Sequence, residues 1–98
     1  MKASKEYLRT ICECFVLDTM VLDILQFGNQ NEDKIIMELL KSNLEVAAGL
    51  LALGGFSEQE VQSECETIID QCSDEEWVKK SYNHYEKIYN NLKSNRRI

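Results

Sequence analysis

A long apolar stretch from Ile35 to Leu53 constrains the fold more than any other feature of this sequence. The stretch opens with a helical pattern of apolar and charged residues, becomes apolar on nearly all sides, and ends at Gly54 and Gly55. A helix of this kind is stable only at the centre of a helical bundle or in contact with a partner. We therefore expect the rest of the chain to be organised around it.

The remaining sequence predicts more helices joined by short turns. The chain has 98 residues, four glycines and no proline, which leaves room for one modest core and argues against long irregular loops. We predict an all-α protein, a small antiparallel four-helix bundle with short connections. The helices are expected at about 4–27, 32–53, 58–72 and 74–94, within one helical domain that spans residues 1–98.

Two capping boxes predict where the last two helices begin. Ser57 is followed three residues later by Glu60, and Ser73 is followed in the same way by Glu76. In this motif the serine side chain accepts a hydrogen bond from the backbone of the third helical residue, and the glutamate side chain reaches back to the serine backbone. Both serines are therefore predicted as N-caps.

Single residues indicate the other helix ends. Ser4 and Asn31 are predicted N-caps of the first two helices, since their side chains can accept from the first-turn amides. Gly28 is expected to end the first helix, and Gly54 with Gly55 the second, because glycine readily adopts the left-handed conformation of a helix C-terminus.

The charge distribution is lopsided. Residues 57–76 contain eight acidic residues and no lysine or arginine, whereas residues 77–98 contain six basic residues and one acidic residue. The formal net charge of −6 opposes direct binding to nucleic acid or to an anionic membrane. The acidic residues either form an ordinary solvated surface or a docking surface for a basic partner protein. The residues predicted for this surface are Glu60, Glu64, Glu66, Asp70, Asp74 and Glu75.

Two polar residues fall on the apolar sides of the first two helices. Asp18 lies in the middle of the apolar side of the first helix, and Asn43 lies on the apolar side of the second. If these helices are antiparallel, both residues lie at similar distances from the connecting turn and can meet in the core. We expect a buried polar pair that fixes helix register, or alternatively a buried acid that serves a substrate.

A strip of small residues, Ala48, Gly49 and Ala52, continues the solvent side of the second helix. Small side chains allow a neighbouring helix to approach closely. Together with the surplus of apolar surface on this helix, the strip predicts a site of self-association, with a homodimer as the product.

The cysteines and the histidine do not form a recognisable catalytic or metal motif. Cys12 and Cys14 lie on different sides of one helix, and Cys65 and Cys72 are two turns apart. Neither pair has a metal-binding spacing or can form a local disulfide, so we expect free thiols and no metal or other cofactor. His84 has no nucleophile placed beside it by sequence, and no catalytic residues are predicted.

These observations favour a non-enzymatic interaction protein. The expected protein is a small helical inhibitor that binds a basic, nucleic-acid-acting partner protein through its acidic side. Small acidic helical proteins that neutralise nucleases, among them toxin immunity proteins and phage anti-defence inhibitors, are similar in general character. The alternatives are a structural or regulatory homodimer and an enzyme that uses Asp18 or His84. We see neither a secretion signal nor a membrane-spanning stretch, and reduced thiols favour the cytoplasm.

Overall fold

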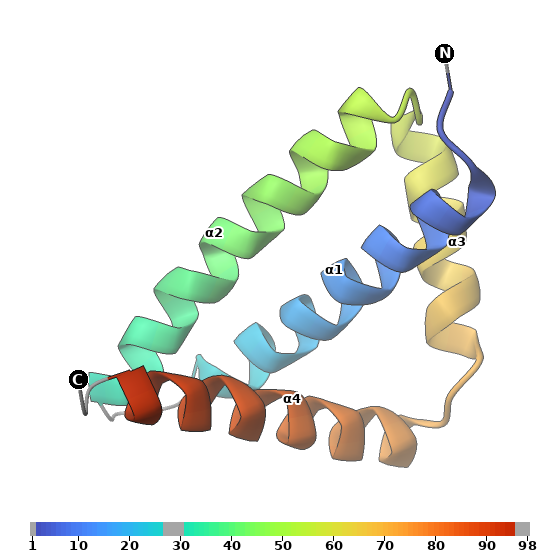
Figure 1. Cartoon of the computed structure of the whole chain (residues 1–98). Coiled ribbons are helices and arrows are strands. Elements are labelled where there is room, and N and C mark those ends of the chain that lie inside the picture. Colours follow the sequence, from blue (N-terminus) through green and yellow to red (C-terminus); the bar gives the residue numbers. More distant parts are fainter. Residues whose placement is uncertain (1, 27–30, 96–98) are drawn as a thin grey trace.

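The computed structural model describes residues 2–26 and 31–95, which fold into four helices: α1 (Lys5–Leu25), α2 (Asn31–Leu53), α3 (Glu58–Asp70) and α4 (Asp74–Asn95). Helices α1 and α2 run antiparallel beside each other, α3 lies along one end of this pair, and α4 crosses the other end (Figure 1). The predicted all-α fold, a small four-helix bundle with short connections, is confirmed.

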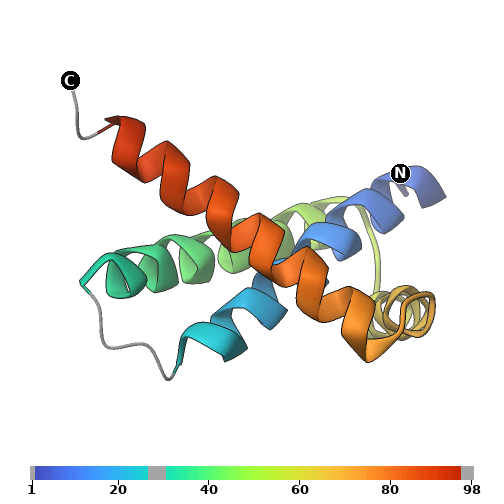
Figure 2. The same ribbon diagram turned by 90° about the horizontal axis from the view of Figure 1, so that it is seen from below.

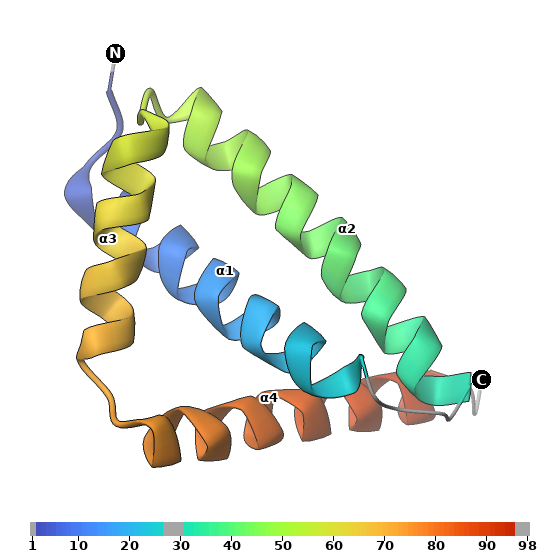
Figure 3. The ribbon, with the colours of Figure 1, turned by 180° about the vertical axis from the view of Figure 1, so that it is seen from behind.

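Helix α1 forms the centre of the bundle. It packs against α2, α3 and α4, and α2 also contacts α4. Seen from behind, α1 lies inside a triangle formed by the other three helices (Figure 3). The apolar stretch of α2 was expected either at the centre of the bundle or in contact with a partner. The centre is occupied by α1 instead. Only one side of α2 is buried, and Val46 and Leu53 are 59% and 82% exposed.

The core consists of two clusters, one at each end of α1. The first joins the N-terminal half of α1 to the end of α2, the inner side of α3 and the start of α4. Its buried members are Leu8, Cys12, Val16, Leu51, Ile68 and Trp77. The second joins the C-terminal half of α1 to the start of α2 and the rest of α4, and its buried members are Val21, Leu25, Ile36 and Leu40. Because Val16 and Val21 belong to different clusters, Asp18 lies at the junction of the two.

The helices are splayed rather than aligned along one axis. Helix α4 crosses over α1 and α2 when the molecule is seen from below (Figure 2). The radius of gyration is 14.6 Å, slightly above the roughly 13 Å expected for a compact domain of about 100 residues. None of the helices in the described ranges is long and apolar enough to cross a membrane.

Both capping boxes are confirmed. The Ser57 hydroxyl accepts from the Glu60 backbone amide at 3.2 Å, and the Glu60 carboxylate accepts from the Ser57 amide at 3.2 Å. At α4, the Ser73 hydroxyl accepts from the Glu76 amide at 3.2 Å, and the Glu76 carboxylate accepts from the Ser73 amide at 3.5 Å. Helix α3 ends at Asp70, two residues before its predicted end, because the residues that precede Ser73 form the turn into α4.

The start of α1 is also as predicted. The Ser4 hydroxyl accepts from the Tyr7 amide at 3.2 Å and caps the helix. The helix ends at Leu25, slightly earlier than expected. The predicted termination at Gly28 and the predicted capping by the Asn31 side chain lie outside the described part of the chain, although α2 already begins at Asn31.

The end of α2 is a Schellman motif built on Gly55. This residue has a φ of +83°, which L side chains rarely adopt. Its amide donates to the carbonyl of Ala52 at 3.1 Å, and the amide of Phe56 donates to the carbonyl of Leu51 at 3.3 Å. These two bonds satisfy the last carbonyls of the helix and turn the chain towards α3.

Gly54 allows the start of the chain to pack closely on the end of α2. A β-carbon at this position would lie 2.8 Å from a ring carbon of Tyr7. The Tyr7 hydroxyl donates to the carbonyl of Leu50 at 2.7 Å, and the amide of Ala3 donates to the carbonyl of Gly54 at 2.8 Å. The N-terminal segment is thereby attached to α2 through the carbonyl of Gly54 and through a second bond to the carbonyl of Leu50, which also accepts from the Gly54 amide.

Two glycine substitutions should change stability in opposite directions. Gly55→Ala should lower the free energy of unfolding by about 1 kcal/mol, because it forces an alanine into the left-handed region. Gly49→Ala should raise it by about 0.5 to 1 kcal/mol, because Gly49 is an exposed helix position and its added methyl group meets no atom within 4 Å. The measurement is chemical denaturation of both variants; a shift of the same sign in both would contradict the assignment of Gly55 as the helix terminator.

Candidate functional site

The carboxylate of Asp18 is the buried charge at the middle of the fold. The residue is 7% exposed on α1, and its position between the two core clusters leaves it largely shielded from water. An isolated ionised carboxylate in such a place is costly, so it requires a partner. The identity of this partner determines the chemistry that the Asp18 carboxylate can take part in.

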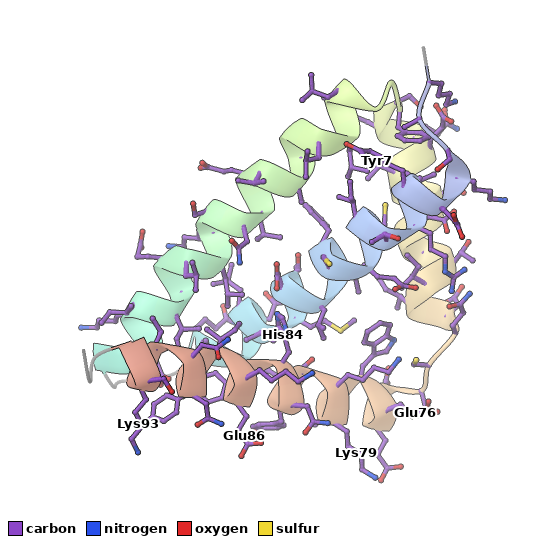
Figure 4. The ribbon with its side chains drawn as sticks, in the orientation of Figure 1. Tyr7, Glu76, Lys79, His84, Glu86 and Lys93 are labelled. Atoms are coloured by element: carbon purple, nitrogen blue, oxygen red, sulfur yellow. The ribbon has the colours of Figure 1, made fainter. Side chains whose placement is uncertain are left out.

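The partner of Asp18 is His84 on α4. The Nε2 atom of His84 lies 2.6 Å from Oδ1 of Asp18, and the histidine side chain is 29% exposed. An ionised carboxylate only accepts hydrogen bonds, so Nε2 carries a proton and donates it to Oδ1. In Figure 4 His84 points from α4 towards α1, whereas Lys79, Glu86 and Lys93 point away from α1.

The predicted buried pair of Asp18 with Asn43 is not formed. Asn43 is exposed, and within the described part of the chain its side chain makes no hydrogen bond with Asp18. Helix α2 turns Leu40 and Ala47 towards the core, where they are 0% and 8% exposed. Asn43 is therefore left on the flank of α2 that faces solvent.

A second buried carboxylate is also satisfied by α4. Asp33, 8% exposed near the start of α2, accepts a hydrogen bond from the hydroxyl of Tyr85 at 2.7 Å. Tyr85 directly follows His84 in the chain. Two consecutive residues of α4 therefore bind one acid on α1 and one on α2. Nothing in the local sequence pattern identifies Asp33 as the partner of Tyr85, because the two residues are 52 positions apart.

A cavity of about 370 Å³ lies beside the Asp18–His84 pair. Helices α1 and α2 form most of its wall, and His84 is contributed by α4. Its lining is mostly apolar, with a few polar groups, and consists of Thr10, Ile11, Cys14, Leu17, Asp18, Asn43, Val46, Ala47, Leu50 and His84. An apolar cavity with a few convergent polar groups is the usual form of a binding site, and this one is the candidate functional site.

The cavity has the acid and the histidine of a catalytic dyad but lacks an activated nucleophile. The pKa of the Cys14 thiol is raised by burial and, to a smaller extent, by the nearby carboxylates of Asp18 and Glu13. Within the described residues His84 makes no hydrogen bond with Cys14. A raised pKa keeps this thiol protonated at neutral pH and therefore less nucleophilic.

The other cysteines belong mainly to the core between α1 and α3. The pKa of the Cys12 thiol is raised to about 12 by burial and, to a smaller extent, by the interaction with the neighbouring Cys65 thiol. All four cysteines are free thiols in the described ranges. No three histidine, cysteine or acidic side chains among the described residues are grouped so that they could hold a metal ion.

The predicted acidic surface follows α3 and the first turn of α4. Glu66, Asp70, Asp74 and Glu75 are exposed, and Glu64 is half-buried. The Glu60 carboxylate already has two partners: it accepts from the Lys2 ammonium and from the Ser57 backbone amide. Both bonds lower the pKa of Glu60, and the bond from Lys2 has the larger effect. In this surface Glu60 pairs with Lys2, and the other five carboxylates have no cation within ion-pair distance in residues 2–26 and 31–95.

The small strip of α2 lies on the surface. Ala48, Gly49 and Ala52 are all exposed, and a methyl group added at Gly49 would meet no atom within 4 Å. The strip is therefore not used for contact between the helices of one molecule.

Comparisons of this chain with models of known protein families, with curated proteins and with solved structures found no match. Its function is therefore inferred from its own residues.

The Asp18–His84 bond should appear as a coupling energy in a double-mutant cycle. His84→Leu should cost about 2 kcal/mol, because it leaves a buried carboxylate with no partner, and the partial exposure of His84 keeps the loss below that of a fully buried pair. Asp18→Leu should cost less than about 1 kcal/mol, because the remaining imidazole can be hydrated and leucine suits the apolar surroundings.

The double variant should be close to Asp18→Leu alone, which gives a coupling of at least about 1 kcal/mol. The measurement is denaturant unfolding of the four proteins with a common slope. If the two single effects add to within about 0.5 kcal/mol, the pair does not stabilise the fold.

Proposed function

We propose that this protein is a non-enzymatic protein-binding module, an inhibitor of the immunity or anti-defence type that acts in the cytoplasm on a basic, nucleic-acid-acting partner protein. The observation that supports this proposal most directly is the unpaired charge on the acidic surface. Among the described residues, Lys2 is the only cation within ion-pair distance of its six carboxylates, and it pairs with Glu60 alone. A basic partner would provide the missing counter-charge.

An apolar residue within the acidic surface supports the same proposal. Ile69 is 41% exposed and lies one turn from Glu66 and beside Asp70 on α3. Protein interfaces commonly combine an apolar anchor with a charged rim: the anchor contributes affinity, and the rim accelerates encounter. Glu66 and Asp70 would form such a rim around Ile69.

A second candidate function is a structural or regulatory homodimer. It is favoured by the exposed apolar side chains of α2, which are Ile35, Leu39, Val46, Leu50 and Leu53. At 100° per residue these side chains fall on one side of the helix, whereas Ala48 and Ala52 fall on the opposite side. A dimer through α2 could use either side, and light scattering of the purified protein tests whether a dimer forms.

Reversing two charges on the acidic surface should slow association with the partner. In Glu66→Lys/Asp70→Lys the rate of association should fall roughly tenfold at low salt, because attraction between opposite charges steers the encounter. Glu60 is left unchanged because it also caps α3. The measurement is a pull-down from the native host, followed by association kinetics with the captured partner.

The matched control is Glu38→Lys/Glu45→Lys, which makes the same change in net charge at exposed positions of α2. It should leave the association rate much closer to that of the wild type. The wild-type rate should also fall as the Debye length decreases from about 10 Å at 0.1 M salt to about 3 Å at 1 M. Equal rates for the two double variants would refute a role for the acidic surface.

A further inference from the structure

The cavity beside Asp18 contains an unused hydrogen-bond acceptor. Oδ1 of Asp18 is bonded to His84, and no other described residue bonds to the carboxylate. No buried nitrogen or oxygen of a described side chain lacks a partner, so Oδ2 of Asp18 must be accessible to solvent. Asp18 is 7% exposed and is one of the residues that line the cavity.

A second polar group in the cavity wall is also available. The side-chain amide of Asn43 is exposed and makes no hydrogen bond with any described residue. Its carbonyl oxygen, like the carboxylate of Asp18, can accept a hydrogen bond. A ligand in the cavity would therefore find two acceptors on opposite walls, one from α1 and one from α2.

The charges around the cavity favour a cationic ligand. Asp18 lines the cavity, and no lysine or arginine is present among its lining residues. Cys14, in the same wall, senses the carboxylates of Asp18 and Glu13, which help to raise its pKa after the larger effect of burial. A cation that approaches Oδ2 would meet a negative potential in partly desolvated surroundings, where charge interactions are stronger than in water.

The rest of the wall suits an apolar body of modest size. Leu17, Val46 and Leu50 line the cavity with their side chains. The volume of about 370 Å³ is at the small end of the usual range for ligand sites, about 300 to 1,000 Å³. It exceeds the roughly 150 Å³ that suffices for benzene in an engineered cavity, so one aromatic ring with a short arm would fit.

We propose that this cavity binds a small primary amine that has an apolar body. The ammonium group donates to Oδ2 of Asp18 and to the side-chain oxygen of Asn43, while the body lies against Leu17, Val46 and Leu50. His84 holds the carboxylate in position through Oδ1. This binding is separate from the protein-binding role proposed for the acidic surface of α3.

The probe for this proposal is 2-phenylethylamine, titrated into the ¹⁵N-labelled protein. Two compounds with similar bodies serve as controls: 2-phenylethanol, which has no charge, and 3-phenylpropionate, which has the opposite charge. The amine should bind at least tenfold more tightly than either control. Its largest amide shifts should fall near residues 10–18 of α1 and 43–50 of α2.

Two variants test the site in different ways. Asp18→Asn keeps the shape of the side chain and should weaken amine binding at least tenfold, whereas Asp70→Asn makes the same change on the exposed surface of α3 and should have no effect. Val46→Trp should also abolish binding, because the larger side chain fills the cavity. The fold should tolerate this change, since Val46 is 59% exposed.

A lysine side chain of a partner protein offers similar chemistry, and Nα-acetyl-lysinamide is therefore included. Tighter binding of 2-phenylethylamine supports a free small amine, and tighter binding of the lysine derivative would overturn that assignment. Equal binding of the amine and the alcohol, or equal binding to wild type and Asp18→Asn, would also refute the proposal. Absence of any saturable shift up to 10 mM amine would refute it as well.

Discussion

The carboxylate of Asp18 sets the strictest condition on this fold. It lies on α1, the helix that contacts the other three, at the point where one core cluster gives way to the other. An acid in this place must be neutralised or hydrogen-bonded. His84 meets this need at 2.6 Å, and Tyr85 does the same for Asp33 at 2.7 Å. Helix α4 is thereby fixed in rotation and in position along its axis, because its two consecutive polar residues must reach α1 and α2 together.

The features that the sequence predicted well are local. The bonds of Ser57 with Glu60 connect residues three apart, and the termination at Gly55 depends on a single backbone angle. Helical periodicity also placed Asp18 on the apolar side of its helix. Its partner could not be predicted, because His84 is 66 residues away and meets Asp18 only through the crossing of α4 over α1. Asn43 was predicted as the partner of Asp18 because the two residues lie at similar distances from the turn between α1 and α2. That distance does not define the rotation of α2 about its own axis.

The surface of the protein divides into regions with different chemistry. The carboxylates of α3 are exposed beside Ile69, and only Glu60 has a cation within ion-pair distance among the described residues. Helix α2 instead exposes apolar side chains, because α1 and α4 bury only one of its sides. The cavity between α1 and α2 combines apolar walls with the carboxylate of Asp18. Each region suits a different kind of contact. The acidic surface of α3 can be tested by substitutions that leave the other two intact, whereas Val46 and Leu50 belong both to the cavity and to the exposed apolar side of α2.

The bond between His84 and Asp18 joins α4 to α1, and ¹⁵N NMR of the imidazole ring can observe it in solution. His84 is the only histidine in the chain, so its ring signals need no assignment. We expect a slowly exchanging proton on Nε2, and we expect Asp18→Asn to shift both ring nitrogens. Ring signals typical of a freely exchanging, solvent-exposed histidine, identical in the wild type and in Asp18→Asn, would contradict it.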